Sequence, residues 1–129
     1  MSTVTDGHSD AAEPAFTLGP YSPATRAGNL VFTSAQSGVD PATNEVPPGG
    51  FEAECRQAFA NLSRTLKAAG AELAEVVKMT VLYTDLSYLP VINEIFTETF
   101  PDTPPARTAA VVRLAGNRRI AIDAIAATS

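Results

Sequence analysis

The sequence contains no tryptophan, one cysteine and one histidine. A single cysteine excludes an internal disulfide, and the position of Cys55 among apolar residues at helical spacing favours a buried, unreactive thiol. The histidine, His8, lies in a polar N-terminal stretch. This placement argues against a histidine-based metal site and against a serine–histidine nucleophile pair. We therefore expect no metal centre.

Long apolar runs and basic stretches are also missing. No apolar run approaches the roughly 20 residues that a membrane-spanning helix needs, and no basic segment followed by an apolar one marks a secretory signal. The formal net charge is −5, without a basic stripe or an array of stacking aromatics. These features argue against membranes and nucleic acids as partners.

The 129 residues suit a single domain with one core. Residues 1–14 are mostly small and polar, and we expect them to form a disordered N-terminal extension. Residues 15–129 carry the apolar patterning and are predicted to form the folded domain.

Two segments have the apolar spacing of amphipathic helices. The first begins near Phe51 and is predicted to end at Gly70 as its C-terminal cap. The second begins after Asp85 or Ser87, tolerates Pro90 in its first turn, and includes Asn93 on its apolar stripe. The apolar positions are Phe51, Cys55, Phe59, Leu62 and Leu66 in the first helix, and Leu89, Ile92, Phe96 and Phe100 in the second.

Alternating and β-branched segments predict strands at 30–36 and 76–84. Two further runs, 104–114 and 119–127, are predicted to form a hairpin, with Gly116-Asn117 supplying a primed turn. The resulting order favours an α+β two-layer sandwich, in which a mixed sheet carries two helices on one face. The opposite sheet face keeps apolar side chains, so we expect a homo-oligomer that covers it.

Arg107 follows a proline pair at the start of one predicted strand. Prolines restrict the backbone there, so Arg107 lies on a stiff segment. Its guanidinium is therefore suited to bidentate hydrogen bonding with a carboxylate. The ordinary alternative, favoured by spacing alone, is a surface ion pair at a strand end.

Short fragments throughout the chain stand in an order that resembles the RidA (YjgF-like) family. The resemblance covers about Pro14 to Ala127. The fragments are Gly19-Pro20-Tyr21, Gly28-Asn29-Leu30-Val31-Phe32-Thr33-Ser34, Val39-Asp40-Pro41, Arg56-Gln57-Ala58, Asn61-Leu62, Ala68-Ala69-Gly70, Val76-Val77-Lys78, Asn93-Glu94, Pro105-Ala106-Arg107 and Ala124-Ile125-Ala126.

The resemblance implies a chorismate-mutase-like fold and a homotrimer with pockets at the subunit interfaces. It also implies a cytoplasmic, cofactor-free hydrolase that converts reactive 2-enamino and 2-imino acids to 2-keto acids and ammonia. By the same resemblance, Arg107 binds the substrate carboxylate. The residues implied to line the pocket with it are Tyr21, Ser34, Asn93 and Ala109.

The sequence departs from the family pattern in its last strand. Active members have a glutamate, credited with holding the hydrolytic water, where Ala121 stands here. Asp123 occupies a second glutamate position but is expected to pair with Arg113, Arg119 or backbone. Pro23, Ala35 and Ala109 also differ from the usual residues. The site is therefore predicted to be divergent.

Three functions remain open on the sequence. The first is a deaminase that is weak or acts on an altered substrate. The second is a non-hydrolytic enzyme of the same fold, catalysing a tautomerisation, condensation or cyclisation, because a dry pocket without a water-activating carboxylate would protect an imine. The third is a non-catalytic trimer that binds carboxylates.

Overall fold

A computed structural model of the chain describes residues 19–129. The expected extension at 1–14 and the predicted start of the domain at 15 lie outside the described residues. The strands are β1 (Ala24–Ala27), β2 (Leu30–Thr33), β3 (Gln36–Ser37), β4 (Val76–Tyr83), β5 (Ala106–Val111) and β6 (Ile120–Ala127), and the helices are α1 (Gly50–Ala68), α2 (Leu89–Thr99) and the short 3-10 helices η1 (Leu73–Glu75) and η2 (Leu86–Tyr88).

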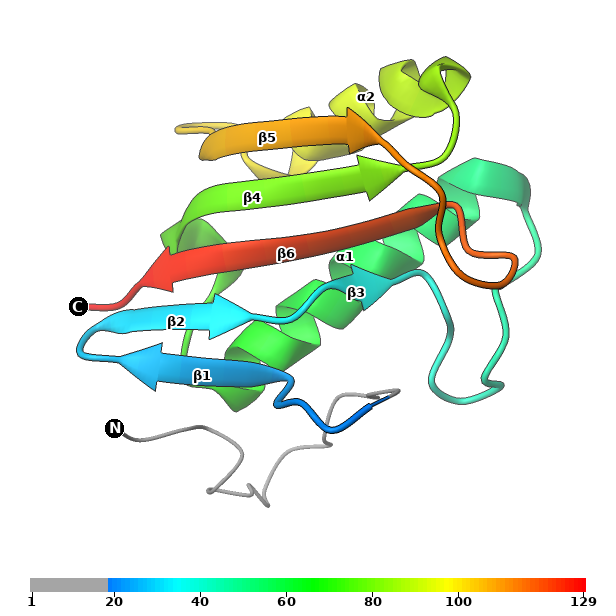
Figure 1. The fold of residues 1–129 in the computed structure, drawn as a ribbon. Helices are drawn as coiled ribbons and strands as arrows, with labels where there is room; N and C mark the ends of the chain where they lie inside the picture. The colour runs from blue at the N-terminus through cyan, green and yellow to red at the C-terminus, as the bar shows by residue number, and fades with distance from the viewer. Residues whose placement is uncertain (1–18) are drawn as a thin grey trace.

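The strands form one mixed sheet in the order β1-β2-β6-β4-β5, and β3 also pairs with β6. The pairing of β4 with β5 is parallel, whereas the other pairings are antiparallel. Both long helices lie on the same side of the sheet (Figure 1). This arrangement confirms the predicted α+β class with two helices on one face.

The predicted C-terminal hairpin is wrong. Strand β4 lies between β5 and β6, so the two strands never pair with each other. Residues 112–119 instead cross the end of β4 as an irregular connection. Gly116 has the positive φ of 66° that a primed turn needs, but Asn117 does not, so the turn cannot reverse the chain tightly.

The long helices follow the sequence pattern closely. Helix α1 ends at Ala68, and Gly70 adopts a φ of 84° just beyond it. The Ala71 N–H donates to the Leu66 carbonyl at 2.8 Å, which completes a Schellman-type end. Asp85 caps η2 by accepting from the Ser87 N–H at 2.8 Å, and α2 begins directly after η2 with its proline in the first turn.

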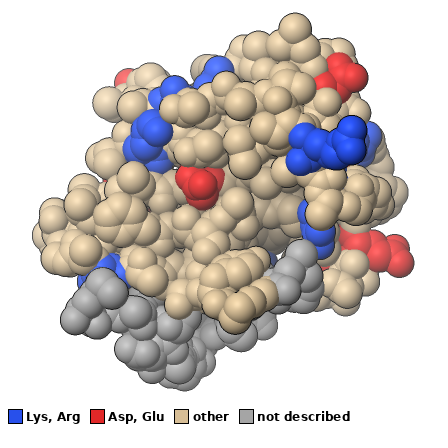
Figure 2. All heavy atoms as spheres, in the orientation of Figure 1, with Lys and Arg blue, Asp and Glu red and all other residues tan. Residues whose placement is uncertain are grey.

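Alternate residues of β6 divide the sheet into a buried and an open face. Ile120, Ile122, Ala124 and Ala126 are buried against the helices, whereas the residues between them are half-buried. On the open face Ile125 pairs with Phe32, which is 36% exposed. Figure 2 shows mainly uncharged atoms over this face, with one acidic group near its middle.

Irregularities in two strands change which side chains point outward. The β4–β6 register shifts between Val76 and Lys78, so Val77 is 49% exposed although Met79 and Val81, the next alternate residues of the strand, are buried. The predicted strand at 30–36 is also interrupted, at Ser34 and Ala35. Phe32 pairs with Ile125 and Gln36 pairs with Ile122 of β6. The segment from Phe32 to Gln36 is therefore one residue longer than the part of β6 opposite it, and the extra residue forms a bulge.

Among residues 19–129, no helix has both the length and the apolar content required to cross a bilayer.

Candidate active site

Arg107 stands near the start of the edge strand β5, where it pairs with Met79 of β4. Its Nη1 donates to Asn93 Oδ1 at 2.9 Å, and its guanidinium carbon lies 4.9 Å from the ring centre of Phe96. Both contacts come from α2 and hold the guanidinium on one side of the strand. Within residues 19–129, no carboxylate forms an ion pair with Arg107. The alternative prediction, that Arg107 forms a surface ion pair, therefore does not hold among residues 19–129.

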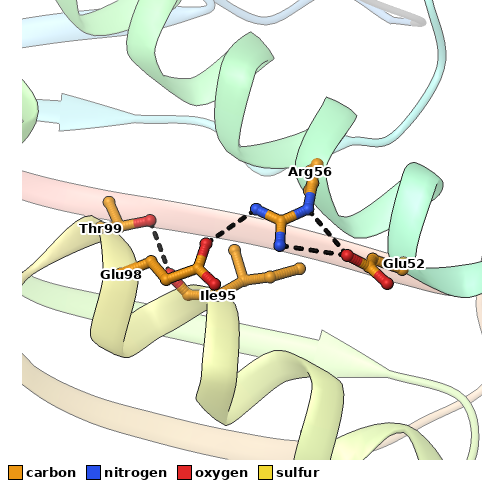
Figure 3. Close-up of polar contacts among 5 residues, drawn as sticks. All are labelled: Glu52, Arg56, Ile95, Glu98 and Thr99. Atoms are coloured by element: carbon orange, nitrogen blue, oxygen red, sulfur yellow. Dashed lines mark hydrogen bonds and ion pairs between the residues drawn. The ribbon is translucent and has the colours of Figure 1, made fainter.

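Asn93 is exposed rather than buried on the apolar stripe of α2, although its amide oxygen has found a partner in Arg107. The position of α2 is in turn tied to α1 by Arg56, which lies between Glu52 of its own helix and Glu98 of α2 (Figure 3). The Arg56–Glu98 contact is 2.9 Å long, and Arg56 lowers the pKa of the Glu98 carboxyl. This link helps to fix the helix that orients Arg107.

A cavity of about 190 Å³ opens at the other end of the molecule, beside β3 and the 112–119 connection. It is lined by Tyr21, Ala35, Gln36, Ser37, Val39, Pro41, Asn61, Arg64, Leu114, Ala115, Arg118 and Ala121. No acidic residue is among them, and Ala121 stands where the family resemblance places a glutamate. The residue missing from the expected pattern therefore lies in the wall of this cavity.

Ser34 and Ala109 do not line the cavity. The Ser34 hydroxyl donates to the Ser22 carbonyl at 2.6 Å, which fixes the bulge that presents its neighbour Ala35 to the cavity. Ala109 lies two residues after Arg107 on the same strand, is exposed, and therefore shares the side on which Arg107 points.

The five expected site residues thus fall into two groups within one chain. Arg107, Asn93 and Ala109 gather at β5 and α2, whereas Tyr21 lines the cavity and Ser34 lies beside it. The groups also lie on different faces of the sheet, because Arg107 pairs with buried Met79 and Ala121 with half-buried Leu82 of the open face. One copy of the described chain does not bring them around a single ligand.

Asp123 lies on the open face of β6, opposite Thr80 of β4. It forms no ion pair with Arg113 or Arg119 in residues 19–129, so those two of its three expected partners, the third being backbone, are wrong. Arg119 is engaged elsewhere, because Glu54 projects from α1 toward the start of β6.

The Glu54–Arg119 pair was not predicted from the sequence. Glu54 is fully buried and accepts from the Arg119 backbone N–H at 2.7 Å and from its Nε at 2.6 Å. The Arg119 guanidinium carbon also lies 5.9 Å and 5.8 Å from the stacked rings of Phe51 and Tyr88. Glu54 raises the pKa of Arg119 and anchors the 112–119 connection, which supplies three residues to the cavity wall.

Arg64 and Arg118 were also missed. Arg64 Nη2 donates to Asn61 Oδ1 at 2.8 Å, and this asparagine is 5% exposed. The three-residue spacing of Asn61 and Arg64 on one helix was the available signal. Nothing in the local pattern around Arg118 marked it as a cavity residue.

Cys55 is buried, as predicted, and burial raises the pKa of its thiol to about 12. A neutral, enclosed thiol is a poor nucleophile. Cys55 therefore belongs to the core and not to the site.

A family model described as Endoribonuclease L-PSP matches residues 12–128 of the chain. A 2-iminobutanoate/2-iminopropanoate deaminase from Bos taurus is 40% identical over 119 residues, which cover 92% of this chain and 86% of the relative. The chain belongs to the RidA (YjgF-like) family.

Solved structures agree with this assignment to the RidA family. The structure of RidA from the Antarctic bacterium Psychrobacter sp. has 38% identity and a TM-score of 0.83, covering 89% of this chain and 94% of that one. The structure of Escherichia coli TdcF with bound serine has 34% identity and a TM-score of 0.82, covering 90% and 94%. Both likenesses extend over about nine-tenths of this chain.

Proposed function

We propose that this RidA-family protein hydrolyses 2-imino and 2-enamino acids to 2-keto acids and ammonia. The observation that carries the proposal is Arg107, which Asn93 orients and which no carboxylate occupies within residues 19–129. The deaminase names of relatives support it. The serine bound to TdcF supports a small ligand that carries a carboxylate.

The chemistry needs no cofactor. Arg107 pairs with the carboxylate of the substrate and withdraws electron density from the adjacent imine carbon. Water adds to that carbon, a proton reaches the nitrogen, and collapse of the tetrahedral adduct releases ammonia and leaves the keto group. Holding the substrate and the water in reacting geometry lowers the barrier even without a strong base.

We propose that the site is shared between copies in a homotrimer. Arg107 and Asn93 of one copy would face Tyr21 and Ala121 of the next, which joins the two groups that one chain keeps apart. The apolar open face around Phe32 and Ile125 supports burial between subunits. Light scattering tests the assembly. We expect a mass three times the 13.5 kDa of one chain, and a mass of one chain would overturn it.

We propose that Ala121 makes hydrolysis slower than in relatives with a glutamate there. Losing a positioned general base costs about 10²–10⁴-fold in rate. The cavity wall without an acidic residue also favours a second candidate, in which the same pocket protects the imine and catalyses a tautomerisation, condensation or cyclisation.

The decisive assay generates 2-iminopropanoate in situ from D-alanine with an amino-acid oxidase and follows its conversion to the keto acid. We expect a rate above that in buffer, and loss of the acceleration in Arg107→Ala. Arg113→Gln is the matched control, because it removes an exposed arginine from the same part of the chain and should keep the rate.

A rate equal to that in buffer, or an acceleration that survives Arg107→Ala, would overturn the proposed hydrolysis. Calorimetry with 2-oxobutanoate then separates the remaining functions: binding without turnover supports a carboxylate-binding trimer, whereas a new product supports the non-hydrolytic enzyme.

A further inference from the structure

The cavity beside β3 combines two guanidiniums with no neutralising acid. Arg64 and Arg118 both line it, and neither forms an ion pair in the part of the chain that the structure describes. This local charge is opposite in sign to the formal net charge of −5 of the chain. Two unpaired positive charges beside one small cavity suggest a role in binding an anion, because solubility alone does not require them to be close together.

Two acidic residues close to the cavity lining in the chain are already engaged. Asp40, between Val39 and Pro41 of the cavity wall, uses Oδ1 to accept from the Ala42 N–H at 2.9 Å and does not line the cavity. Glu54 is held by Arg119. Neither carboxylate is therefore positioned to cancel the charge of Arg64 or Arg118, and Asp123, five residues after Arg118, forms an ion pair with neither of them in residues 19–129.

Arg64 is held in place by a buried amide. Asn61 donates through Nδ2 to the carbonyls of Ser37 and Val39, both at 2.8 Å, and its Oδ1 accepts from Arg64 and from Gln57. Both the nitrogen and the oxygen of the Asn61 amide are therefore held by hydrogen bonds, and its oxygen in turn accepts from one N–H of the Arg64 guanidinium. Because arginine has five N–H donors, the others remain able to bind a ligand in the cavity.

Arg118 comes from the opposite wall, on the connection that enters β6. Its neighbour Arg119 is anchored to buried Glu54 through both backbone and side chain. Arg118 itself has no hydrogen-bond partner among residues 19–129. It is therefore an available donor on an anchored segment.

From these observations we propose that the cavity binds a second anionic group of the substrate. The preferred substrates are then 2-imino acids whose side chain ends in a carboxylate or a phosphate. This inference rests on the proposed function, in which Arg107 of a neighbouring copy holds the other carboxylate. A negative side chain also accounts for Ala121, because a glutamate there would repel it. A guanidinium pair fits both planar carboxylates and phosphates.

The first test compares two imines made in situ: 2-iminosuccinate from D-aspartate, and 2-iminobutanoate. We expect the ratio of their kcat/KM values to favour the diacid by about ten-fold, the value of one charge-assisted hydrogen bond. Arg64→Gln and Arg118→Gln should each lower this ratio toward one. Arg113→Gln, which removes the same charge outside the cavity, should leave the ratio unchanged.

A ratio near one in the unsubstituted protein, or a ratio that neither Arg64→Gln nor Arg118→Gln changes, would overturn the inference while hydrolysis of 2-iminobutanoate stood. Thermal unfolding of each variant shows whether a lost preference reflects a lost fold. A variant that unfolds is replaced by Arg64→Lys or Arg118→Lys. These substitutions keep the positive charge but lose the planar guanidinium that can donate two parallel hydrogen bonds. These lysine variants should keep part of the preference, and an unchanged ratio in them counts against the inference.

The second test measures binding by calorimetry and does not depend on turnover. We expect 2-oxoglutarate to bind about ten-fold more tightly than 2-oxobutanoate, with Arg118→Gln removing the difference. Including 3-phosphohydroxypyruvate distinguishes the two anions, since the tighter ligand identifies the natural group. If no imine is hydrolysed but this difference persists, the proposed hydrolysis fails and the anion site stands. Equal binding of all three keto acids would overturn the site.

Discussion

Replacing Asn93 with alanine removes the side chain that aims Arg107 without touching the guanidinium. The bond from Nη1 to Oδ1 is 2.9 Å long and involves a charged donor, but Asn93 is exposed. Its contribution therefore lies at the lower end of the range for such bonds, about 1 kcal/mol. That value corresponds to about a five-fold loss of kcat/KM for 2-iminopropanoate.

The loss should fall mainly on KM. Arg107 holds the carboxylate in the ground state and the transition state alike, and weakening such uniform binding raises KM while kcat changes little. Asn93→Asp should raise KM further, because the new carboxylate competes with the substrate for the guanidinium. Initial rates over a range of imine concentrations, generated in situ, separate the two parameters.

Thr97→Ala is the matched control, since Thr97 is exposed one turn later on α2, is not the residue that hydrogen-bonds Arg107, and does not line the cavity. It should leave both parameters unchanged. The reasoning is refuted if Asn93→Ala lowers kcat with KM intact, or if Asn93→Asp binds substrate as well as the unsubstituted protein.

Three further predictions test other parts of the account. Ala121→Glu should raise the rate of hydrolysis of 2-iminopropanoate, which has no second anionic group, by about 10²-fold by restoring a base, whereas Ala74→Glu on the exposed surface should not; no gain would show that water activation lies elsewhere. Gly38→Ala places a Cβ in steric clash with the Glu54 carbonyl oxygen, so chemical denaturation should show a loss of about 2 kcal/mol or more, against little change for Gly19→Ala. Cys55 should resist iodoacetamide at pH 8 until denaturant is added, because its pKa is raised to about 12; its contribution to stability is present below the unfolded pKa near 9 and is lost as the pH rises toward 12.

The helices were predictable because their signals are local. Apolar residues at three- and four-residue steps, Gly70 beyond the end of α1 and Asp85 before α2 each act within a few residues of their own position. Burial of Ile92 and Phe96 follows from the same spacing. Such features need no knowledge of what packs against them.

The sheet was harder because pairing partners are not encoded locally. The run at 104–111 and the run at 120–127 look like hairpin strands, but β4 separates them by pairing with both. The bulge at Ser34 and Ala35 arises from a mismatch with β6, where the Ala124 N–H donates to the hydroxyl of Thr33. The run of residues 30–36 carries no sign of that interruption.

The same distinction between local and long-range signals explains which site residues could be predicted. Arg107 was suggested by the prolines before it and by the family resemblance, and Asn93 by the resemblance; the structure brings the two into contact although they lie 14 positions apart. Arg64, Arg118 and Glu54 were not found, because their roles depend on α1 meeting the start of β6. A charged residue on a helix gives the same local pattern whether it faces solvent, a cavity or a buried partner.

The most direct test of the central claim is a crystal structure of the protein with 2-oxobutanoate bound. We predict that both carboxylate oxygens lie within hydrogen-bond distance of the Arg107 guanidinium, and that Tyr21 of a neighbouring copy closes the site. A ligand carboxylate bound elsewhere, with Arg107 still contacting only Asn93 and Phe96, would contradict the account.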